Sequence, residues 1–153
     1  MDQIPLGDNS VIEDMKLYGT EVWLYRDDQG KLVGFSSLGQ TKYTWPVGSK
    51  KKEKVNVIPF IGVHADFKGE PKDADRDDKY AYQILDDLLA TAVDRALSSG
   101  IYALIVLNVD DQNKRAIRFY EHREFVDLKI PREDKDKGIT YMRMARHLDD
   151  LIL

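Results

Sequence analysis

The sequence contains no cysteine, which excludes disulfides, thiolate metal sites and cysteine nucleophiles. It also lacks any run of the roughly 18 apolar residues that a membrane-spanning helix needs. The segment at its start, MDQIPLGDNS, has neither the basic nor the apolar region of a signal peptide. The net charge of −4 is not a basic excess, so we expect no nucleic-acid partner. These absences favour a cytoplasmic protein without a membrane partner.

Several familiar catalytic motifs are missing too, because there is no GxSxG, no GxxxxGKS/T and no HExxH. The three histidines, His64, His122 and His147, have no metal-ligand spacing, so we predict no metal site. His122 and His147 lie among charged residues, which favours surface positions. His64 ends an apolar segment, and an imidazole with an ordinary pKa of about 6.5 suits a general base. A histidine without a chemical role is the alternative for His64.

With 153 residues, of which 42% are hydrophobic and 33% charged, the chain has the length and composition of one globular domain over residues 1–153. A β-hairpin is predicted for Glu21–Leu38, with Gly30 supplying the positive φ of its turn. Residues 39–54 are predicted as a loop. The basic run in that loop, Lys50–Lys54, is either a solvated hairpin tip or a contact with an acidic partner or cofactor phosphates.

A third strand is expected at Val55–Ala65. Pro59 has no N–H for a β-ladder, so it predicts a bulge, an irregular edge or a strand start, and Gly62 indicates a close approach to the backbone. These two features suggest a ligand site near the end of the strand, and a plain kinked strand is the alternative. Residues 66–78 are polar and predict a loop.

A long amphipathic helix follows, because apolar residues recur at helical spacing and Gly100 supplies a C-terminal stop. The recurring positions are Ala81, Ile84, Leu85, Leu88, Leu89, Ala92, Val93 and Ala96. The apolar run Ile101–Leu107 then predicts a strand buried on both faces. Together, Val55–Val109 form a predicted βαβ unit with two parallel strands.

The stretch from Ile101 to Phe125 is the centre of the predicted domain. After the strand comes a polar break, and Asn113 is placed to cap a short helix that contains Tyr120. Ligands usually bind at this end of a strand in open sheets covered by helices. A tyrosine with a pKa of about 10 is a poor base but a workable proton donor to a departing thiolate. The alternative is a core aromatic residue whose hydroxyl is hydrogen-bonded.

Further along the chain, the pattern predicts a short strand at Phe125–Ile130, a charged hairpin loop at Pro131–Gly138 and a half-exposed strand at Ile139–Ala145. The tail, residues 147–153, is predicted as a last helical turn or a partner contact. Near the start, Val11–Tyr18 has a weak pattern for one or two helical turns.

The segment NKRAIRFYEHREF, with Asn113, Ala116, Phe119, Tyr120 and Phe125, resembles the N-x-x-A-x-x-apolar-Y-x-x-x-G-F segment of the GNAT superfamily of N-acetyltransferases. The order of predicted elements over residues 21–146 is similar to that family as well. The resemblance implies a mixed, mostly antiparallel sheet with a central parallel strand pair and helices on both faces. It also implies acetyl-CoA as co-substrate, bound where the two parallel strands part.

Site roles follow from the resemblance residue by residue. The backbone of Ile61, Gly62 and Val63 is implied to bind the pantetheine arm, and Asn113 to position the cofactor or the turn. Tyr120 is implied to protonate the departing coenzyme A thiolate. His64, Asp66 or a water relay is left as the general base.

The sequence departs from the family pattern at three places. The pyrophosphate motif is interrupted, and the candidate residues for that contact are Lys68, Gly69, Arg76, Lys79, Tyr80 and Ala81. Glu124 stands where the family has glycine, which we expect to alter the turn into the next strand. The region before Glu21 holds only part of the family's first strand and helices, so the N-terminal region is expected to be short.

We therefore expect an N-acetyltransferase that transfers an acetyl group from acetyl-CoA to a primary amine of a small molecule or a protein. The alternative is a non-catalytic GNAT-like domain that binds a CoA ester or a protein partner. A homodimer is a further expectation, because the tail has apolar ends.

Overall fold

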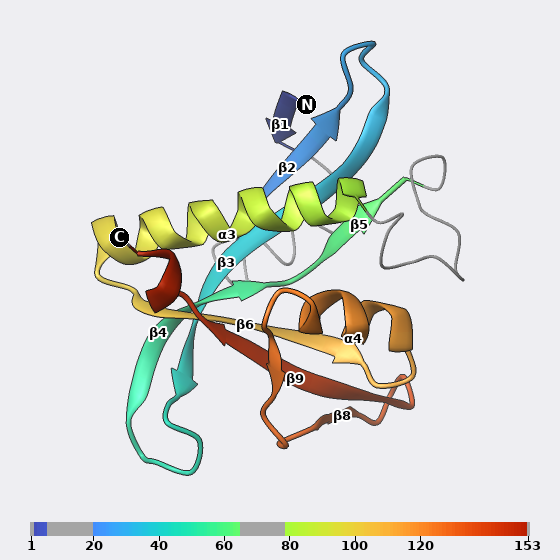
Figure 1. Cartoon of the computed structure of the whole chain (residues 1–153). Helices are drawn as coiled ribbons and strands as arrows, with labels where there is room; N and C mark the ends of the chain where they lie inside the picture. The colour runs from blue at the N-terminus through green and yellow to red at the C-terminus, as the bar shows by residue number, and fades with distance from the viewer. Residues whose placement is uncertain (1, 6–19, 65–78, 153) are drawn as a thin grey trace.

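The computed structural model describes residues 2–5, 20–64 and 79–152, with the backbone alone for residues 2–5. These residues form a nine-stranded mixed sheet with two α-helices and a final 3-10 turn (Figure 1). The strands are β1 (Asp2–Pro5), β2 (Glu21–Arg26), β3 (Leu32–Thr44), β4 (Lys52–Ile58), β5 (Ile61–Val63), β6 (Tyr102–Asp110), β7 (Val126–Asp127), β8 (Arg132–Asp134) and β9 (Ile139–His147). The helices are α3 (Lys79–Ser99), α4 (Lys114–Glu121) and the 3-10 turn η3 (Asp149–Leu151).

The order of the strands places one parallel pair at the centre of the sheet. The order is β1-β2-β3-β4-β6-β9-β7, while β5 pairs with β3 and β8 pairs with β9. Strands β4 and β6 are parallel, and the other pairs among the described strands are antiparallel. The predicted mixed sheet and the predicted βαβ unit are therefore confirmed.

Both described helices pack on the same face of the sheet. Leu88 of α3, Ile117 of α4 and Leu107 of β6 belong to one buried apolar cluster. The opposite face has a smaller cluster, built on the alternate residues of the same strands and covered by Tyr43, Trp45 and Leu128; its buried members are Val55, Val57, Leu104, Val106 and Ala145. The described residues thus place helices on one face, and the helical turns predicted for Val11–Tyr18 lie outside the described ranges.

Helix α3 forms where its apolar periodicity predicts. Its buried positions, Ile84, Leu85, Leu88, Leu89 and Ala92, form a stripe along one side that covers the sheet. Gly100 follows the last helical residue with a φ of +66°, a conformation that glycine adopts without the strain of a side chain. The predicted helix and its C-terminal stop are confirmed.

The second hairpin is longer than the sequence indicates. The sequence predicts a loop over residues 39–54, but β3 continues to Thr44 and β4 begins at Lys52, so only residues 45–51 connect them. The arm buries only one of its faces at this end, through Tyr43 and Trp45, while its lysines remain in solvent. A charged segment with a single apolar face gives a weak strand pattern, which explains the error.

The predicted third strand is divided in two. The β3–β5 ladder ends at Ser36 opposite Ile61, and the β3–β4 ladder begins at Gly39 opposite Val57. Between these pairs β3 has two residues, 37 and 38, and the facing segment has three, 58–60, so that segment contains a one-residue bulge. The break that Pro59 predicts is confirmed.

The C-terminal region also differs from the prediction. The strand expected at Phe125–Ile130 is reduced to β7, because Glu124 and Lys129 have positive φ angles of 66° and 62° that interrupt extended backbone on both sides. Part of the segment expected to be a loop, Pro131–Gly138, pairs with β9 as strand β8. Strand β9 and the last helical turn, η3, are found where they are expected.

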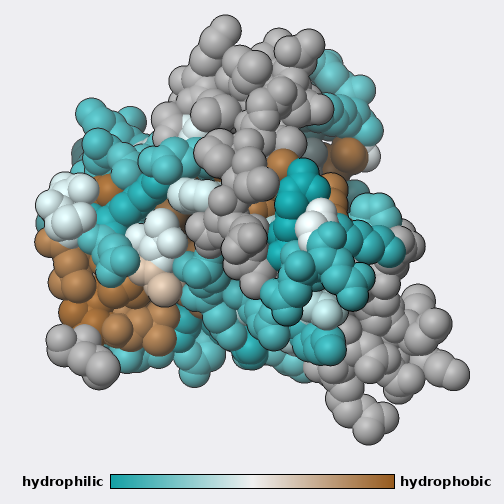
Figure 2. Space-filling model, turned by 90° about the horizontal axis from the view of Figure 1, so that it is seen from above, coloured by the Kyte–Doolittle hydropathy of each residue, from teal (hydrophilic) through white to brown (hydrophobic). Residues whose placement is uncertain are grey.

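One end of the molecule exposes apolar residues. Figure 2 shows hydrophobic surface on its left, at the end that carries the C-terminus of α3 and η3, where Leu97 and Leu151 are exposed. The predicted homodimer stays a prediction. None of the helices in the described ranges has the length and apolar character to cross a bilayer.

Replacing Gly34 on β3 tests how closely β3 and β5 pack. A Cβ at position 34 would overlap the carbonyl oxygen of Gly62 and lie 3.0 Å from Cδ1 of Ile84. We expect Gly34→Ala to lower the free energy of unfolding by about 1–3 kcal/mol, the usual cost of forcing extra atoms into a packed core. Urea unfolding followed by circular dichroism measures this change. A variant as stable as the wild type would show that the two strands lie further apart.

Candidate functional site

The candidate site lies where β5 separates from β6. The parallel ladder between β4 and β6 ends with Ile58 opposite Leu107. Beyond this pair, β6 continues to Asp110 alongside β9, whereas β5 pairs with β3. Two neighbouring segments of the sheet therefore part in its interior, after the bulge.

The edge of β5 that faces the parting has no ladder partner among the described strands. The His64 N–H donates to the Val33 carbonyl of β3 at 2.6 Å. Because backbone groups alternate in direction along a strand, those of Gly62 also point to β3, and those of Ile61 and Val63 point away from it. The backbone of Ile61 and Val63 thus offers hydrogen-bonding groups to the space between β5 and β6.

A cavity of about 500 Å³ lies beside β5, between this strand and α4. Strands β3 and β5 line it together with α4 and the first turn of α3, and most of the lining is apolar. The lining residues are Leu32, Gly34, Phe35, Ile61, Gly62, Val63, His64, Ala81, Asn113, Arg115, Ala116, Phe119 and Tyr120. Among them, Arg115 has a permanent positive charge and no residue is a carboxylate. A ligand pocket of this size suits a small molecule or one arm of a larger one.

Helix α4 is fixed at its start by Asn113. The Asn113 side-chain oxygen accepts a hydrogen bond from the Ala116 N–H at 3.1 Å, as an N-cap does. Ala116 and Tyr120 are four residues apart and so share one side of the helix, and both line the cavity. The predicted cap is confirmed, and it sets the direction in which α4 leaves the sheet.

Tyr120 is the lining residue whose pKa is shifted by burial. Its side chain is 8% exposed and packs edge-on against Phe119 and Phe125, at centroid distances of 5.1 and 5.5 Å. A tyrosine that serves only as a core residue needs a hydrogen-bond partner for its hydroxyl. Within the described ranges the Tyr120 hydroxyl has no such partner. Burial raises the pKa of Tyr120, because the phenolate is poorly solvated there. The hydroxyl therefore keeps its proton at neutral pH.

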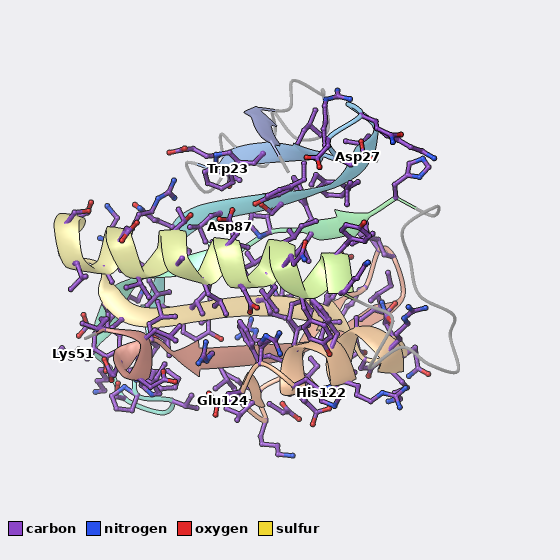
Figure 3. The ribbon with its side chains drawn as sticks, turned by 45° about the horizontal axis from the view of Figure 1, so that its top comes forward. Trp23, Asp27, Lys51, Asp87, His122 and Glu124 are labelled. Carbon is purple, nitrogen blue, oxygen red and sulfur yellow. The ribbon has the colours of Figure 1, made fainter. Side chains whose placement is uncertain are left out.

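The end of α4, where Figure 3 labels His122, is attached to α3 by a group of side chains. The Arg123 guanidinium donates to both oxygens of Asp86, at 2.7 and 3.2 Å, and lies 4.2 Å from the centre of the Tyr82 ring. The Tyr82 hydroxyl is 3.1 Å from Nδ1 of His122. These contacts cross-link the two helices at His122 and Arg123, just after Tyr120 in the chain.

The structure gathers most of the described candidate residues around the cavity. Ile61, Gly62, Val63, His64, Ala81, Asn113 and Tyr120 all line it. Lys79 and Tyr80 lie on the same first turn of α3 but do not line the cavity, and the Lys79 ammonium is 5.0 Å from the Tyr80 ring centre. Lys68, Gly69 and Arg76, with the alternative base Asp66, lie outside the described residues.

Six lining residues are absent from the candidates predicted from the sequence: Leu32, Gly34, Phe35, Arg115, Ala116 and Phe119. The sequence does contain a signal for Gly34, because a glycine inside a strand pattern often marks a place where another part of the chain or a ligand lies close to the backbone. The neighbour that Gly62 indicates is the Phe35 ring, which lies 2.6 Å from the position of a Cβ at residue 62. The position of Arg115 depends on the angle between α4 and β5, which the local sequence does not define.

Comparisons with known proteins give a fold but no close relative. No family model and no curated protein matches the chain. Among solved structures, a putative GNAT-family acetyltransferase from Desulfovibrio desulfuricans matches with a TM-score of 0.60 and 11% identity, over 91% of this chain and 77% of that one. The spermidine/spermine N-acetyltransferase SpeG from Vibrio cholerae matches with a TM-score of 0.60 and 16% identity, over 94% of this chain and 72% of the other.

A mutant form of the AtaT toxin, bound to the C-terminus of the antitoxin AtaR and to acetyl-CoA, matches with a TM-score of 0.62 and 8% identity, over 94% of this chain and 77% of that one. The chain therefore has the GNAT fold that its sequence resembles.

A KacTA–DNA complex is also among the matches, so the comparisons do not support the expected absence of a nucleic-acid partner.

The buried Tyr120 hydroxyl predicts a pH effect on stability. The pKa of Tyr120 in the folded state is raised above the unfolded value of about 10. The contribution of this protonated hydroxyl to the free energy of unfolding is therefore complete below about pH 10, and it is lost as the pH rises further because the unfolded state releases the proton first. We expect the free energy of unfolding of the wild type to fall relative to that of Tyr120→Phe between about pH 9 and pH 11. Urea unfolding of both proteins across this range measures the difference, and a constant difference would contradict the burial of the hydroxyl.

Proposed function

We propose that this protein is an N-acetyltransferase that transfers an acetyl group from acetyl-CoA to a primary amine. The observation that carries this proposal is the cavity between β5 and α4, which has free backbone groups on one side and the Tyr120 phenol on the other. The GNAT fold, which SpeG and the acetyl-CoA-bound AtaT share, supports the same reaction class.

Tyr120 is the proposed general acid. In the transfer, the amine nitrogen forms a bond to the thioester carbonyl carbon and the carbon–sulfur bond breaks. Tyr120 then gives its proton to the departing thiolate, and the excess proton on nitrogen leaves through a base. The raised pKa keeps the proton on Tyr120 until a thiolate develops nearby, and it makes the phenol a weaker acid than an exposed tyrosine.

The edge of β5 is the proposed binding and polarising element. An arm that contains amides can pair with the outward backbone groups of Ile61 and Val63 in the way that an added strand pairs with a sheet edge. An N–H aimed at the thioester oxygen stabilises the negative charge that develops there. Gly62, between them, is packed against the Phe35 ring and keeps β5 close to β3.

His64 is the proposed general base, directly or through a water. It follows β5, it lines the cavity and its side chain is exposed, so it can exchange protons with solvent. The phosphates of the cofactor are proposed to lie near the start of α3, where helix N–H groups and Lys79 favour an anion. Lys68, Gly69, Arg76 and Tyr80 remain candidates for the same contact.

The alternative function is binding without transfer, either of a CoA ester or of a protein partner. The interrupted pyrophosphate motif and its neighbouring aspartates, Asp73, Asp75, Asp77 and Asp78, favour this alternative because carboxylates repel phosphate. The AtaT structure contains a bound peptide of its antitoxin, which is a protein partner of that toxin.

Binding of acetyl-CoA is tested by thermal unfolding. A ligand that binds only the folded state at about 100 times its Kd adds about 2.7 kcal/mol of stability. We therefore expect millimolar acetyl-CoA to raise the Tm by several degrees, and ATP, which lacks the pantetheine arm, to raise it less. An unchanged Tm at millimolar acetyl-CoA would contradict both the transferase and the CoA-binding alternative.

Catalysis is tested with a Tyr120→Phe variant. Loss of a general acid typically lowers kcat by about 100-fold or more, whereas the Kd of acetyl-CoA should change little. Tyr102→Phe, which removes an exposed hydroxyl from β6, is the control and should keep full activity. Because the chain has no cysteine, a thiol reagent detects only released coenzyme A when a panel of polyamines, amino acids and lysine peptides is screened.

Equal turnover of Tyr120→Phe and the wild type would remove Tyr120 from the mechanism. A Tm shift with acetyl-CoA but no turnover on any amine would favour the non-catalytic alternative.

A further inference from the structure

The bulge between β4 and β5 contains an unusual hydrogen-bonding arrangement around Ser37. The side chain of Ser37 is fully buried on β3 and faces the backbone of Phe60. Its hydroxyl donates to the Phe60 carbonyl at 2.6 Å and accepts from the Phe60 N–H at 2.9 Å. One side chain therefore pairs both backbone groups of one residue.

Phe60 needs such a partner because of its place in the bulge. It stands between the last residue paired in β4 and the first residue of β5, where β3 has one residue fewer. The extra residue of a bulge has no place in the ladder, so its N–H and C=O lack the partners that a regular strand supplies. Pro59, the residue before it, has no N–H to satisfy. Without Ser37, a part-buried backbone N–H and C=O would be left without these partners.

The candidate site begins at the next residue. Ile61 is the first residue of β5 and Val63 is its last, and their outward backbone groups face the space that separates β5 from β6. The direction in which the chain leaves the bulge decides whether these groups remain free or close onto β6. The two hydrogen bonds of Ser37 hold the backbone of Phe60 at this point.

We infer that Ser37 is a positioning residue for the candidate site, and that its hydroxyl holds β5 apart from β6 so that the cavity stays open to a ligand. Ser37 does not line the cavity and acts through the backbone of Phe60. The ligand-binding part of the inference rests on the proposed function. The part that concerns the strand geometry does not, since that geometry can be measured without a ligand.

The neighbouring Ser36 is a matched control. It is also fully buried, but its hydroxyl is 3.0 Å from the Tyr25 hydroxyl, on the other side of β3 from the Ser37 contact with Phe60. Ser36→Ala and Ser37→Ala remove the same atom from adjacent buried positions. A general loss of core stability affects both variants, whereas a change in the separation of β5 from β6 affects Ser37→Ala alone. Ser37→Thr keeps a hydroxyl that can both donate and accept.

The experiment measures amide hydrogen exchange at Phe60 and the Kd of acetyl-CoA in the wild type and the three variants. For Ser37→Ala we expect exchange at Phe60 to be faster and the Kd to be weaker by about 10- to 100-fold, as for the loss of a buried hydrogen-bond partner. For Ser36→Ala and Ser37→Thr we expect both values to stay within about threefold of the wild type, even where the Tm falls. Should Ser37→Ala not fold, Ser37→Cys, whose thiol is a weak donor and acceptor, takes its place with an intermediate result expected.

Two results would overturn the inference. One is a Ser37→Ala variant with the same amide exchange at Phe60 and the same Kd of acetyl-CoA as the wild type. The other is a Ser36→Ala variant in which the exchange and the Kd change as much as in Ser37→Ala. If the wild type itself does not bind acetyl-CoA, the proposed function fails, and the exchange rates at Phe60, Ile61 and Val63 still decide the role of Ser37.

Discussion

Buried backbone N–H and C=O groups must be hydrogen-bonded, and this constraint makes the interior of a sheet a difficult place for an opening. Strands β4 and β6 are paired up to Ile58 and Leu107, after which the two edges separate. Each unpaired buried group costs about 1–3 kcal/mol unless water or a ligand satisfies it. The free edge of β5 therefore presents backbone groups that favour an extended ligand with amides of its own. The pantetheine arm of coenzyme A has this chemistry.

The rest of the site is arranged around that opening. Asn113 starts α4 at the end of β6, so that Ala116 and Tyr120 face the cavity from the side opposite β5. The Arg123–Asp86 pair and the ring of Tyr82 attach α4 to α3 and limit its movement. The described lining offers a proton donor, free backbone groups and one histidine, but no cysteine or serine as a nucleophile. Such a set suits direct attack by an external amine better than a covalent enzyme intermediate.

Much of this arrangement could be predicted from the sequence, because several signals are local. The stripe of apolar residues predicts α3, Gly100 predicts its end, and Asn113 predicts the start of α4. Pro59 predicts the break in the strand, although not its consequence, which depends on Ser37, a residue 23 positions away from Phe60.

Other features depend on contacts that a local pattern does not contain. The sequence does not predict the arm between β3 and β4, because only Tyr43 and Trp45 of this arm pack against the apolar cluster. The interruption of β7 depends on positive φ angles at Glu124 and Lys129, residue types that rarely adopt them. Arg115 and Phe35 reach the cavity only through the relative placement of α4 and β3. The sequence thus predicts the elements and points to His64 and Tyr120, which line the cavity, while the shape of the cavity follows from tertiary packing.

The most direct test of the central claim is an NMR titration of the uniformly labelled protein with coenzyme A. If the arm lies along the free edge of β5, the largest saturable shifts occur at the amides of Ile61 and Val63 and at those near the start of α4. Saturable shifts confined to other surfaces, such as the lysines of the β3–β4 hairpin, or no shifts at millimolar coenzyme A, would contradict the claim.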